Sequence, residues 1–584
     1  MKNNYLITTC LDYSDCKNKK KAILTGDWCF KESNPAHTPY LKLYSNIWDK
    51  TRTLKKDIIK LKKIHTEVNN NISKFLFIYN NKKLSKTIFK FFVHVWLVYY
   101  ISFYYFKWKT LMQILSKNKN LTFNHYKIEK IKKFRNTLDF YNAAFKSNAF
   151  NYLAFQRILK FQIKNKIINI KIKKRNKKFK NEIINNNTES QYTTCIFRIF
   201  INIYQKLFNR KILIIDGFNY KLNILGNLIH FQLPLNFSTL FSFPYNIFKG
   251  NKNISNKKFN IKFKEKNMFK KFLYENLKND IPSCFVENFT FMNTHQSKIN
   301  LKPDKIVTSS LHIHNDYLKL WILKQKFILK KKLIFLEHGA GHHISSLNWF
   351  NYQRKLGNIY IPWKKKNNKL LENIFPNTKY LNNIKKRNTD AKKILYVTNE
   401  FKDYIVHNAA GPLGISKTYV IHNFKIIKNN LRKEISKNLY FLPKSSLNIY
   451  LKLKLKKITN RKNILFSKSL NNEINKSKLI ICTYPQTAFL ESMLSGPTIL
   501  IYNPKNWIPD NDMAKYYRFL KRSKIIFDDP NKAANHINRY WDNLSDWWDD
   551  INVKKSRTLF LKKFKLNQNS YCEFINCFKK INLV

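Results

Sequence analysis

Short apolar runs alternate with helical stretches over the C-terminal part of the chain. Runs at residues 212–215, 305–309 and 332–336 are separated by helical stretches such as residues 315–330. This alternation is typical of βαβ units in a parallel sheet. The pattern predicts two successive parallel-sheet units with a crevice between them, where the carboxyl ends of the strands present ligand-binding loops. The second unit is predicted from apolar runs at residues 394–398, 419–421, 479–482, 498–501 and 524–527.

The N-terminal part has a different pattern. Apolar runs at residues 5–9 and 22–25, the second ending at Gly26, indicate a small α/β element. From residue 47 to about residue 159 the apolar positions follow a helical period. Residues 163–191 are rich in Lys and Asn, and we interpret them as a loop or linker.

One aromatic segment, residues 88–108, is apolar enough to imitate a membrane span. Lys90, His94 and Lys107 lie within it, and Phe and Tyr dominate it rather than Leu, Ile and Val. We therefore favour a buried aromatic helix over a membrane span. If the segment were a span, the protein would be a membrane enzyme.

These patterns predict an α/β fold with two Rossmann-like parallel-sheet domains and an N-terminal, largely helical region. We expect residues 1–205 to hold the small α/β element, the helical region and the Lys/Asn-rich linker. Residues 206–385 and 386–540 would form the two Rossmann-like domains, and residues 541–584 a helical tail.

The composition is strongly basic, with a formal charge of +74 and a pI near 10.0. Such a charge usually indicates a nucleic acid or an anionic membrane as partner. The excess is mainly Lys, which lacks the bidentate fork of Arg, and only 10 Gly and 15 Pro residues occur. We favour the compositional bias of an AT-rich genome as the cause, and a polyanion-binding surface is the alternative.

The eight cysteines are scattered and form no C-x-x-C pair, so neither a zinc ribbon nor a disulfide framework is indicated. Residues 1–15 have polar side chains where a signal peptide would have an apolar core. We expect reduced thiols and a cytoplasmic location.

The sharpest local motif is KKLIFLEHGAGHH at residues 331–343, an apolar strand that ends in Glu337, His338 and two glycines. Gly339 and Gly341 would let backbone N–H groups approach an anion, and a neighbouring His can donate to phosphate or move a proton. This interpretation is favoured over a plain turn. A metal site is the third alternative, with ligands from His338, His342 and His343 and, further away, His312 and His314.

A second motif spans residues 477–504 and predicts a strand, a hydroxyl-bearing turn, a helix, a Gly-Pro turn and a strand. Thr483 and Thr487 lie where the first strand gives way to the helix, so hydroxyls and N–H groups there could hold a diphosphate. Glu491 follows one helical turn later and could accept hydrogen bonds from ribose or sugar hydroxyls. In the alternative interpretation Thr487 is only an N-cap and Glu491 is a solvated residue.

Other nucleotide and hydrolase motifs are absent from the sequence. It contains no P-loop, no G-x-G-x-x-G after a strand and no serine-hydrolase elbow.

The motifs together resemble a family of transferases encoded in bacterial O-antigen and surface-carbohydrate gene clusters, with glycosyltransferase-B-like character in the C-terminal half. The resemblance runs nearly end to end, and the tail is its most specific stretch. Its segments are LITTCLDY at residues 6–13, LTGDWC at 24–29, Trp48-Asp49, IPSCFVENF at 281–289, residues 308–321, HGAG at 338–341, residues 483–491 and FDDPNKAANHINRYWDNLSDWW at 527–548.

The chain departs from the family pattern where activity would lie. Ala340 replaces a Gly, and the acid that tends to follow the His-Gly turn is missing. These losses weaken phosphate contacts and leave the fold assignment unaffected. The other departures are His342, His343, Pro485, Gln486 and Ala488.

The resemblance implies a transferase, with the domain at 386–540 on the donor side. Sugar or a related group would pass from a nucleotide-activated donor to a surface glycan or lipid-linked glycan precursor, without metal or further cofactor. Thr483, Thr487 and the turn from Gly339 to Gly341 would hold phosphate, and Glu491 would hold ribose or sugar. The first candidate for acid/base work is His338, with Asp316 and Glu337 behind it.

We expect the enzyme in the cytoplasm, with peripheral contact at an anionic inner membrane left open. The alternatives are a maturase-like nucleic-acid-binding protein and a non-catalytic scaffold of the same fold. A maturase should carry a Tyr-x-Asp-Asp motif, which the sequence lacks. Nucleic acid is therefore not an expected partner.

Overall fold

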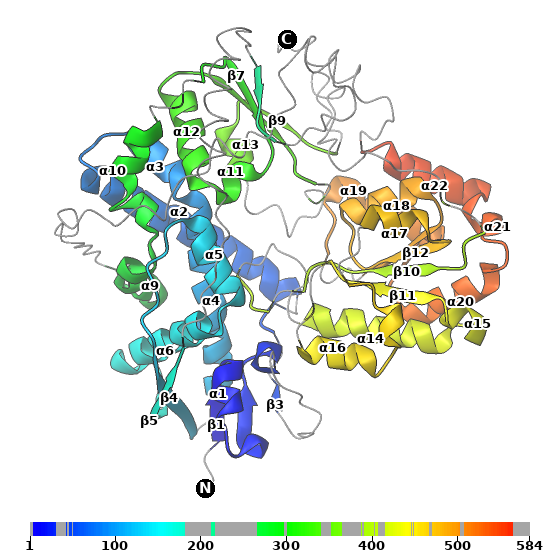
Figure 1. Ribbon diagram of the computed structural model, residues 1–584, viewed down its shortest axis with the longest axis horizontal. Helices are drawn as coiled ribbons and strands as arrows, with labels where there is room; N and C mark the ends of the chain where they lie inside the picture. The colour runs from blue at the N-terminus through cyan, green and yellow to red at the C-terminus, as the bar shows by residue number, and fades with distance from the viewer. Residues whose placement is uncertain are drawn as a thin grey trace.

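The computed structural model contains three parallel β-sheets with helices packed around them (Figure 1). Two of the sheets are the Rossmann-like units that the apolar runs predict, so the expected α/β class is confirmed. The structure describes residues 4–30, 42–43, 46–48, 51–118, 120–180, 212–216, 265–296, 299, 301–339, 341, 352–364, 387, 390–401, 403–406, 415–444, 447, 449–466, 470–502 and 507–564.

The first sheet is larger than the sequence pattern predicted. Its strand order is β3 (Lys42–Leu43), β2 (Ala22–Leu24), β1 (Asn4–Ile7), β4 (Leu121–Ile128) and β5 (Lys171–Phe179), and all neighbours pair in parallel. The prediction of a continuous helical region was wrong at β4, and the prediction of a linker was wrong at β5.

The sequence pattern missed β5 because this strand is defined by its backbone pairing. It is an edge strand with the sequence KIKKRNKKF, and most of its side chains are exposed. Backbone hydrogen bonds to β4 therefore define it, rather than an apolar face, and a hydrophobic period could not reveal it.

The N-terminal helices form the predicted aromatic core. They include α2 (Thr51–Tyr79), α3 (Lys86–Phe92), α4 (His94–Lys117), α5 (Thr137–Lys146) and α6 (Asn148–Lys164). In α4, Phe103 stacks on Phe150 of α6 with ring centroids 5.2 Å apart. Tyr104 packs against Phe272 of α9 (Met268–Asp280) at 5.1 Å. These contacts confirm that residues 94–108 form a buried helix.

Among the described helices, none is by itself long and apolar enough to cross a membrane. Helices α3 and α4 reach that length and composition only together, and they are bent by 50° relative to each other.

The second sheet has the order β6 (Ile212–Ile214), β7 (Lys305–Thr308), β8 (Lys332–Leu336) and β9 (Ile359–Ile361), all parallel. Helices α11 (Leu311–His314) and α12 (Asp316–Phe327) follow β7, and α13 (Tyr352–Leu356) precedes β9. The short helix α10 (Phe289–His295) packs beside the N-terminal helices, where Phe289 contacts Phe89 of α3.

The third sheet has the order β11 (Leu439–Leu442), β10 (Ile394–Val397), β12 (Leu479–Cys482), β13 (Thr498–Ile501) and β14 (Ile526–Phe527), again all parallel. The chain passes from β10 to β11 on one side and then returns to β12 on the other side. The strand order therefore reverses between β10 and β12, and ligands of such sheets bind at the carboxyl ends of the two strands that flank this point.

One strand predicted for the third sheet is a helix. Residues 419–421 lie in α14 (Ile415–Asn430), where Val420, Ile421, Phe424 and Ile427 are all buried. That spacing places them on one face of a helix. The apolar run at 419–421 was too short to separate the two periods.

The three sheet units contact one another. Trp28, after β2, packs on Tyr404 at 6.0 Å, and the Tyr404 hydroxyl donates to Asn148 Oδ1 at 2.7 Å. Phe30 packs on Tyr450 of α16 (Ile449–Lys456) at 5.3 Å.

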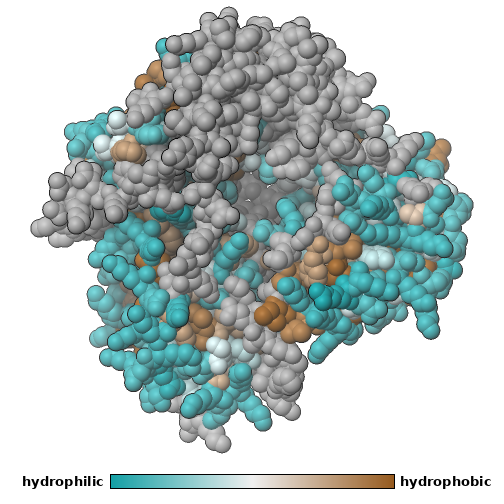
Figure 2. Space-filling view, viewed as in Figure 1, coloured by the Kyte–Doolittle hydropathy of each residue, from teal (hydrophilic) through white to brown (hydrophobic). Residues whose placement is uncertain are grey.

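On the face in Figure 2 the described surface is mainly hydrophilic, and hydrophobic residues gather toward the middle of the view. The expected domain boundaries at 205/206 and 385/386 lie outside the described residues and stay predictions.

Gly26 shows why the LTGDWC motif needs a glycine. The Trp28 ring folds over it, so that a Cβ at position 26 would lie 2.2 Å from the ring. The Trp28 indole N–H donates to the carbonyl oxygen of Thr8 at 2.8 Å. The motif thus fixes the ends of β1 and β2 relative to each other.

Candidate functional site

The turn after β8 begins with a residue that holds the strand end in place. Glu337 is 2% exposed, and its carboxylate accepts a hydrogen bond from the Trp363 backbone N–H at 2.9 Å. The Trp363 indole N–H donates to the Glu337 carbonyl oxygen, also at 2.9 Å. Glu337 therefore positions the turn. His338 follows and is exposed, whereas Gly339 and Gly341 are half-buried.

Gly339 lies directly against the second predicted motif. A Cβ at this position would lie 2.7 Å from Oγ1 of Thr487, which is closer than real Cβ contacts. The sequence placed these residues in different domains, and the fold brings them together from the ends of two sheets. Any side chain at position 339 would force the Thr487 hydroxyl to shift, so glycine suits this approach.

The facing wall is the switch point of the third sheet. Thr483, directly after β12, donates to the Val397 carbonyl oxygen at the end of β10, from its backbone N–H at 3.2 Å and its hydroxyl at 3.0 Å. The two strand ends are thereby joined where the strand order reverses. A ligand at the carboxyl ends of β10 and β12 would meet the Thr483 side chain.

Helix α18 (Thr487–Ser495) begins at this wall. Its N-cap residue is Gln486, whose side chain makes no capping hydrogen bond, so the interpretation of Thr487 as the N-cap was wrong. Thr487 is instead the first residue of the helix. The first N–H groups of a helix have no partner inside it and carry partial positive charge. The start of α18 thus places partial positive charge beside Gly339.

Glu491 lies one turn into α18 and is 4% exposed. The alternative of a solvated Glu491 is therefore wrong. No described residue donates a hydrogen bond to its carboxyl group, and burial raises the pKa of this group to about 8. A buried carboxyl group with a raised pKa can both donate and accept hydrogen bonds at neutral pH.

Asp316, a predicted catalytic candidate, is bonded to other residues of the fold. It is fully buried at the start of α12, where its carboxylate accepts hydrogen bonds from the Thr137 N–H and, at 2.9 Å, from the Thr137 hydroxyl. The Lys319 ammonium lies 2.6 Å from the same carboxylate, and the Cys284 thiol lies at 3.6 Å. Asp316 therefore links α12 to the start of α5, and we leave it out of the reacting groups.

Two residues at the end of the second sheet were not singled out for catalysis. Asp216, after β6, accepts hydrogen bonds from the Thr308 hydroxyl and from the N–H groups of Ser309 and Ser310, at 2.8 and 2.7 Å. Burial opposes its ionised form, but these hydrogen bonds hold its pKa below the usual value. The signal in the sequence was an acid followed by Gly directly after an apolar run.

His312 is the second such residue. It is fully buried between Phe335 and Tyr352, and burial lowers its pKa to about 3. Neither ring nitrogen has a hydrogen-bond partner among the described residues. The metal site considered from the sequence also needs His342 and His343, which lie outside the described residues. That alternative is therefore not tested.

A family model matches the chain over residues 4–575, and its description is LIC12162 family transferase. The chain belongs to the LIC12162 family of transferases. The match confirms the predicted class of enzyme. No curated protein matches the sequence.

Two solved structures match about half of this LIC12162 family member. A putative UDP-N-acetylglucosamine 2-epimerase from Listeria monocytogenes is 13% identical with a TM-score of 0.31, over 50% of this chain and 78% of that chain. The S. aureus MnaA–UDP co-structure is 12% identical with a TM-score of 0.31, over 51% of this chain and 80% of that chain.

Proposed function

We propose that the protein is a glycosyltransferase that moves a sugar or related group from a nucleotide-activated donor to a glycan or lipid-linked glycan acceptor. The observation that supports this proposal most directly is the close approach of Gly339 to Thr487 at the switch point of the third sheet. Membership of a transferase family supports it, as does the glycosyltransferase-B-like resemblance of the C-terminal motifs. We further propose O-antigen or another surface polysaccharide precursor as the acceptor class, and a cytoplasmic reaction with peripheral membrane contact.

In this scheme the donor diphosphate lies beside the junction of the turn at Gly339 and the start of α18. The partial positive charge at the start of α18 and the Thr487 hydroxyl would stabilise its charge, whereas the Thr483 hydroxyl already donates to the Val397 carbonyl oxygen. The bond between the anomeric carbon and the phosphate oxygen breaks, and the nucleoside diphosphate leaves with the electron pair. The acceptor oxygen forms the new bond to the anomeric carbon.

His338 is the proposed base. It is exposed beside the phosphate-facing Gly339, and it would take the proton from the acceptor hydroxyl as the new bond forms. Glu491 would bind ribose or sugar hydroxyls from inside α18, as both donor and acceptor of hydrogen bonds. The positive end of α18 and the Thr487 hydroxyl stabilise the diphosphate in this scheme, which therefore needs no resident metal or cofactor.

Binding of the donor can be tested with Gly339→Ala. The added methyl group would overlap the Thr487 hydroxyl and displace it, so we expect the dissociation constant of the bound nucleoside diphosphate to rise at least tenfold. Calorimetric titration with UDP, GDP, CDP and dTDP and their sugar conjugates would measure it. Thr487→Ala should weaken binding as well, whereas Thr558→Ala on the exposed side of α22 (Ile551–Leu561) is the matched control.

Catalysis is tested separately with His338→Ala. Loss of a general base lowers kcat by about 10²–10⁴-fold, while KM for the donor should change little. Release of nucleoside diphosphate in the presence of acceptor glycan gives the rate. Failure of the unaltered protein to bind any of these nucleotides would refute the proposal.

A further inference from the structure

A cavity of about 880 Å³ lies at the end of the third sheet opposite to Thr483, where the strands begin. Its walls are the end of α19 (Asn511–Arg522), the last turns of α20 (Pro530–Tyr540), α21 (Ser545–Trp548) and the start of α22. Ser523 and Lys524 line it and immediately precede β14, so the cavity sits at the amino ends of the parallel strands. The candidate transferase site is at the carboxyl ends, and the two sites are therefore separate.

The lining carries an excess of positive charge. Its cations are Arg522, Lys524, Arg539 and Lys555, and its carboxylates are Asp546 and Asp550. Both carboxylates already serve the protein's own structure. Asp550 caps α22 by accepting hydrogen bonds from the backbone N–H groups of Asn552 and Val553 at 2.9 and 3.1 Å, and Asp546 accepts one from the side chain of Asn543.

The four cations form no ion pair with any carboxylate that the structure describes. Arg539 lies over the ring of its neighbour Tyr540, with the guanidinium carbon 5.3 Å from the ring centroid. Uncompensated cations around a concave surface attract anions, and Arg in particular suits phosphate.

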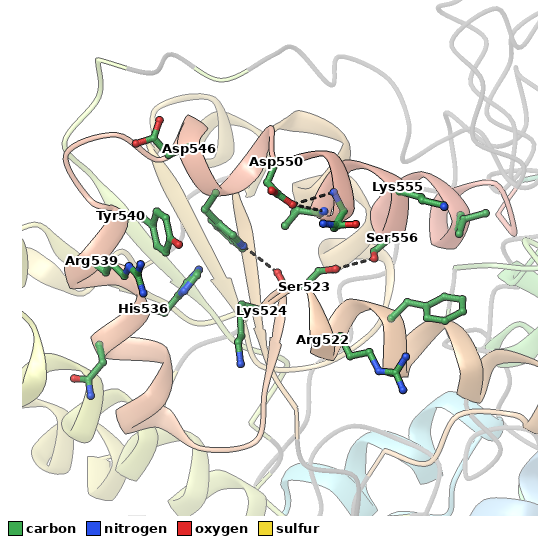
Figure 3. A pocket seen from close by; sticks show the side chains of 16 residues that line it. Arg522, Ser523, Lys524, His536, Arg539, Tyr540, Asp546, Asp550, Lys555 and Ser556 are labelled. Atoms are coloured by element: carbon green, nitrogen blue, oxygen red, sulfur yellow. Dashed lines mark hydrogen bonds between the residues drawn. The ribbon is translucent and has the colours of Figure 1, made fainter.

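His536 lines the cavity close to these cations. Its ring packs against Trp547 at 4.7 Å and Tyr540 at 4.8 Å, and its Nε2 atom is buried without a hydrogen-bond partner. Burial first, and then the charges of Lys524 and Arg539, lower its pKa to about 4. Figure 3 shows His536, Arg539 and Tyr540 together at the end of α20, with Lys524 at the turn that leads into β14.

We propose that this cavity binds a mononucleotide as a second ligand, distinct from the sugar donor. Lys524 and Arg539 would pair with the phosphate, and the base would lie against the aromatic group of Tyr540 and His536. The volume favours a ligand of this size, because small-molecule sites commonly span about 300–1,000 Å³ and an inorganic phosphate would leave most of this one empty.

Calorimetric titration with AMP, ribose 5-phosphate and inorganic phosphate tests the proposal on the full-length chain. We expect AMP to bind at least fivefold more tightly than ribose 5-phosphate, and inorganic phosphate most weakly. The Lys524→Ala/Arg539→Ala variant should raise the dissociation constant for AMP at least tenfold. The control variant Arg518→Ala/Lys532→Ala removes the same charge from exposed positions of α19 and α20 outside the cavity and should bind AMP normally.

A third variant tests the cavity independently of the candidate transferase site. Gly339→Ala should leave AMP binding unchanged, so that this site is assessed independently of the transferase site. The proposal is overturned if AMP does not bind the unaltered protein, or if ribose 5-phosphate binds as tightly as AMP. Equal loss of affinity in the cavity variant and the control variant would overturn it as well.

Discussion

Replacement of Glu491 by Gln removes an ionisable group from the wall of the candidate site with little change in shape. Burial raises the pKa of this carboxyl group from 4.5 to about 8, whereas the unfolded chain exposes it to water. The folded protein therefore keeps Glu491 protonated at neutral pH, and folding takes up a proton above pH 4.5. The side-chain amide of the Glu491→Gln variant does not titrate and has no such linkage.

The size of the effect follows from the shift in pKa. A raised pKa costs no stability below the unfolded value, and the cost then grows until the pH passes the folded value. At about 1.4 kcal/mol per pKa unit, the wild-type protein loses about 3 kcal/mol by pH 7 and about 5 kcal/mol above pH 8. The Glu491→Gln variant should therefore match the wild type at pH 4.5 and exceed its stability increasingly at higher pH.

Urea unfolding at pH 5, 7 and 9, followed by circular dichroism, would measure this difference. Glu434→Gln is the matched control, because Glu434 is 65% exposed on α15 (Lys433–Ser436) and its replacement should change stability by less than about 0.5 kcal/mol. If the stability difference between Glu491→Gln and wild type were the same at pH 5 and pH 9, the pKa of Glu491 would not be raised in the folded protein and the reasoning would be refuted.

Three further outcomes are expected. Asp316→Ala leaves the buried ammonium of Lys319 without its carboxylate, so it should cost about 3–5 kcal/mol in urea unfolding; an unchanged midpoint would contradict the buried ion pair. Lys107→Met should raise the melting temperature, because Lys107 is buried over the Phe103 ring and burial lowers its pKa well below the usual value. Since the unfolded chain binds that proton up to about pH 10.4, the gain should shrink as pH rises, and a gain independent of pH would contradict this reasoning. Binding of single-stranded DNA, measured by fluorescence anisotropy, should be weak at 0.15 M salt and fall steeply with added salt; tight binding at that salt concentration would favour the nucleic-acid-binding alternative.

The apolar runs predicted the central strands of the second and third sheets, because each of these is buried on both faces, but they missed the edge strands β9 and β11. Ile480, Ile481 and Cys482 of β12, for example, are all completely buried. The first sheet was predicted only in part. Its edge strand β5 has mostly exposed side chains, and its pairing with β4 depends on backbone groups that are the same in every residue type.

The candidate site was predicted as two motifs and not as one place. Gly339 and Thr487 were each recognised from a strand exit, but their close approach depends on how two sheet units meet. The roles of the acidic candidates also depended on their surroundings. Asp316 and Glu337 are used within the fold, whereas Glu491 is buried without a described donor, and residue type alone does not distinguish these settings.

The sequence by itself determined the parallel-sheet class, the family and the positions of the two glycine- and threonine-bearing turns. These follow from local patterns of apolar residues and from motifs that are short in sequence. Only the tertiary structure decided that the turns face each other and which carboxyl groups are paired. It also decided that His536, Lys524 and Arg539 surround one cavity. Such contacts join residues far apart in the chain, and their energies depend on burial, which no local pattern contains.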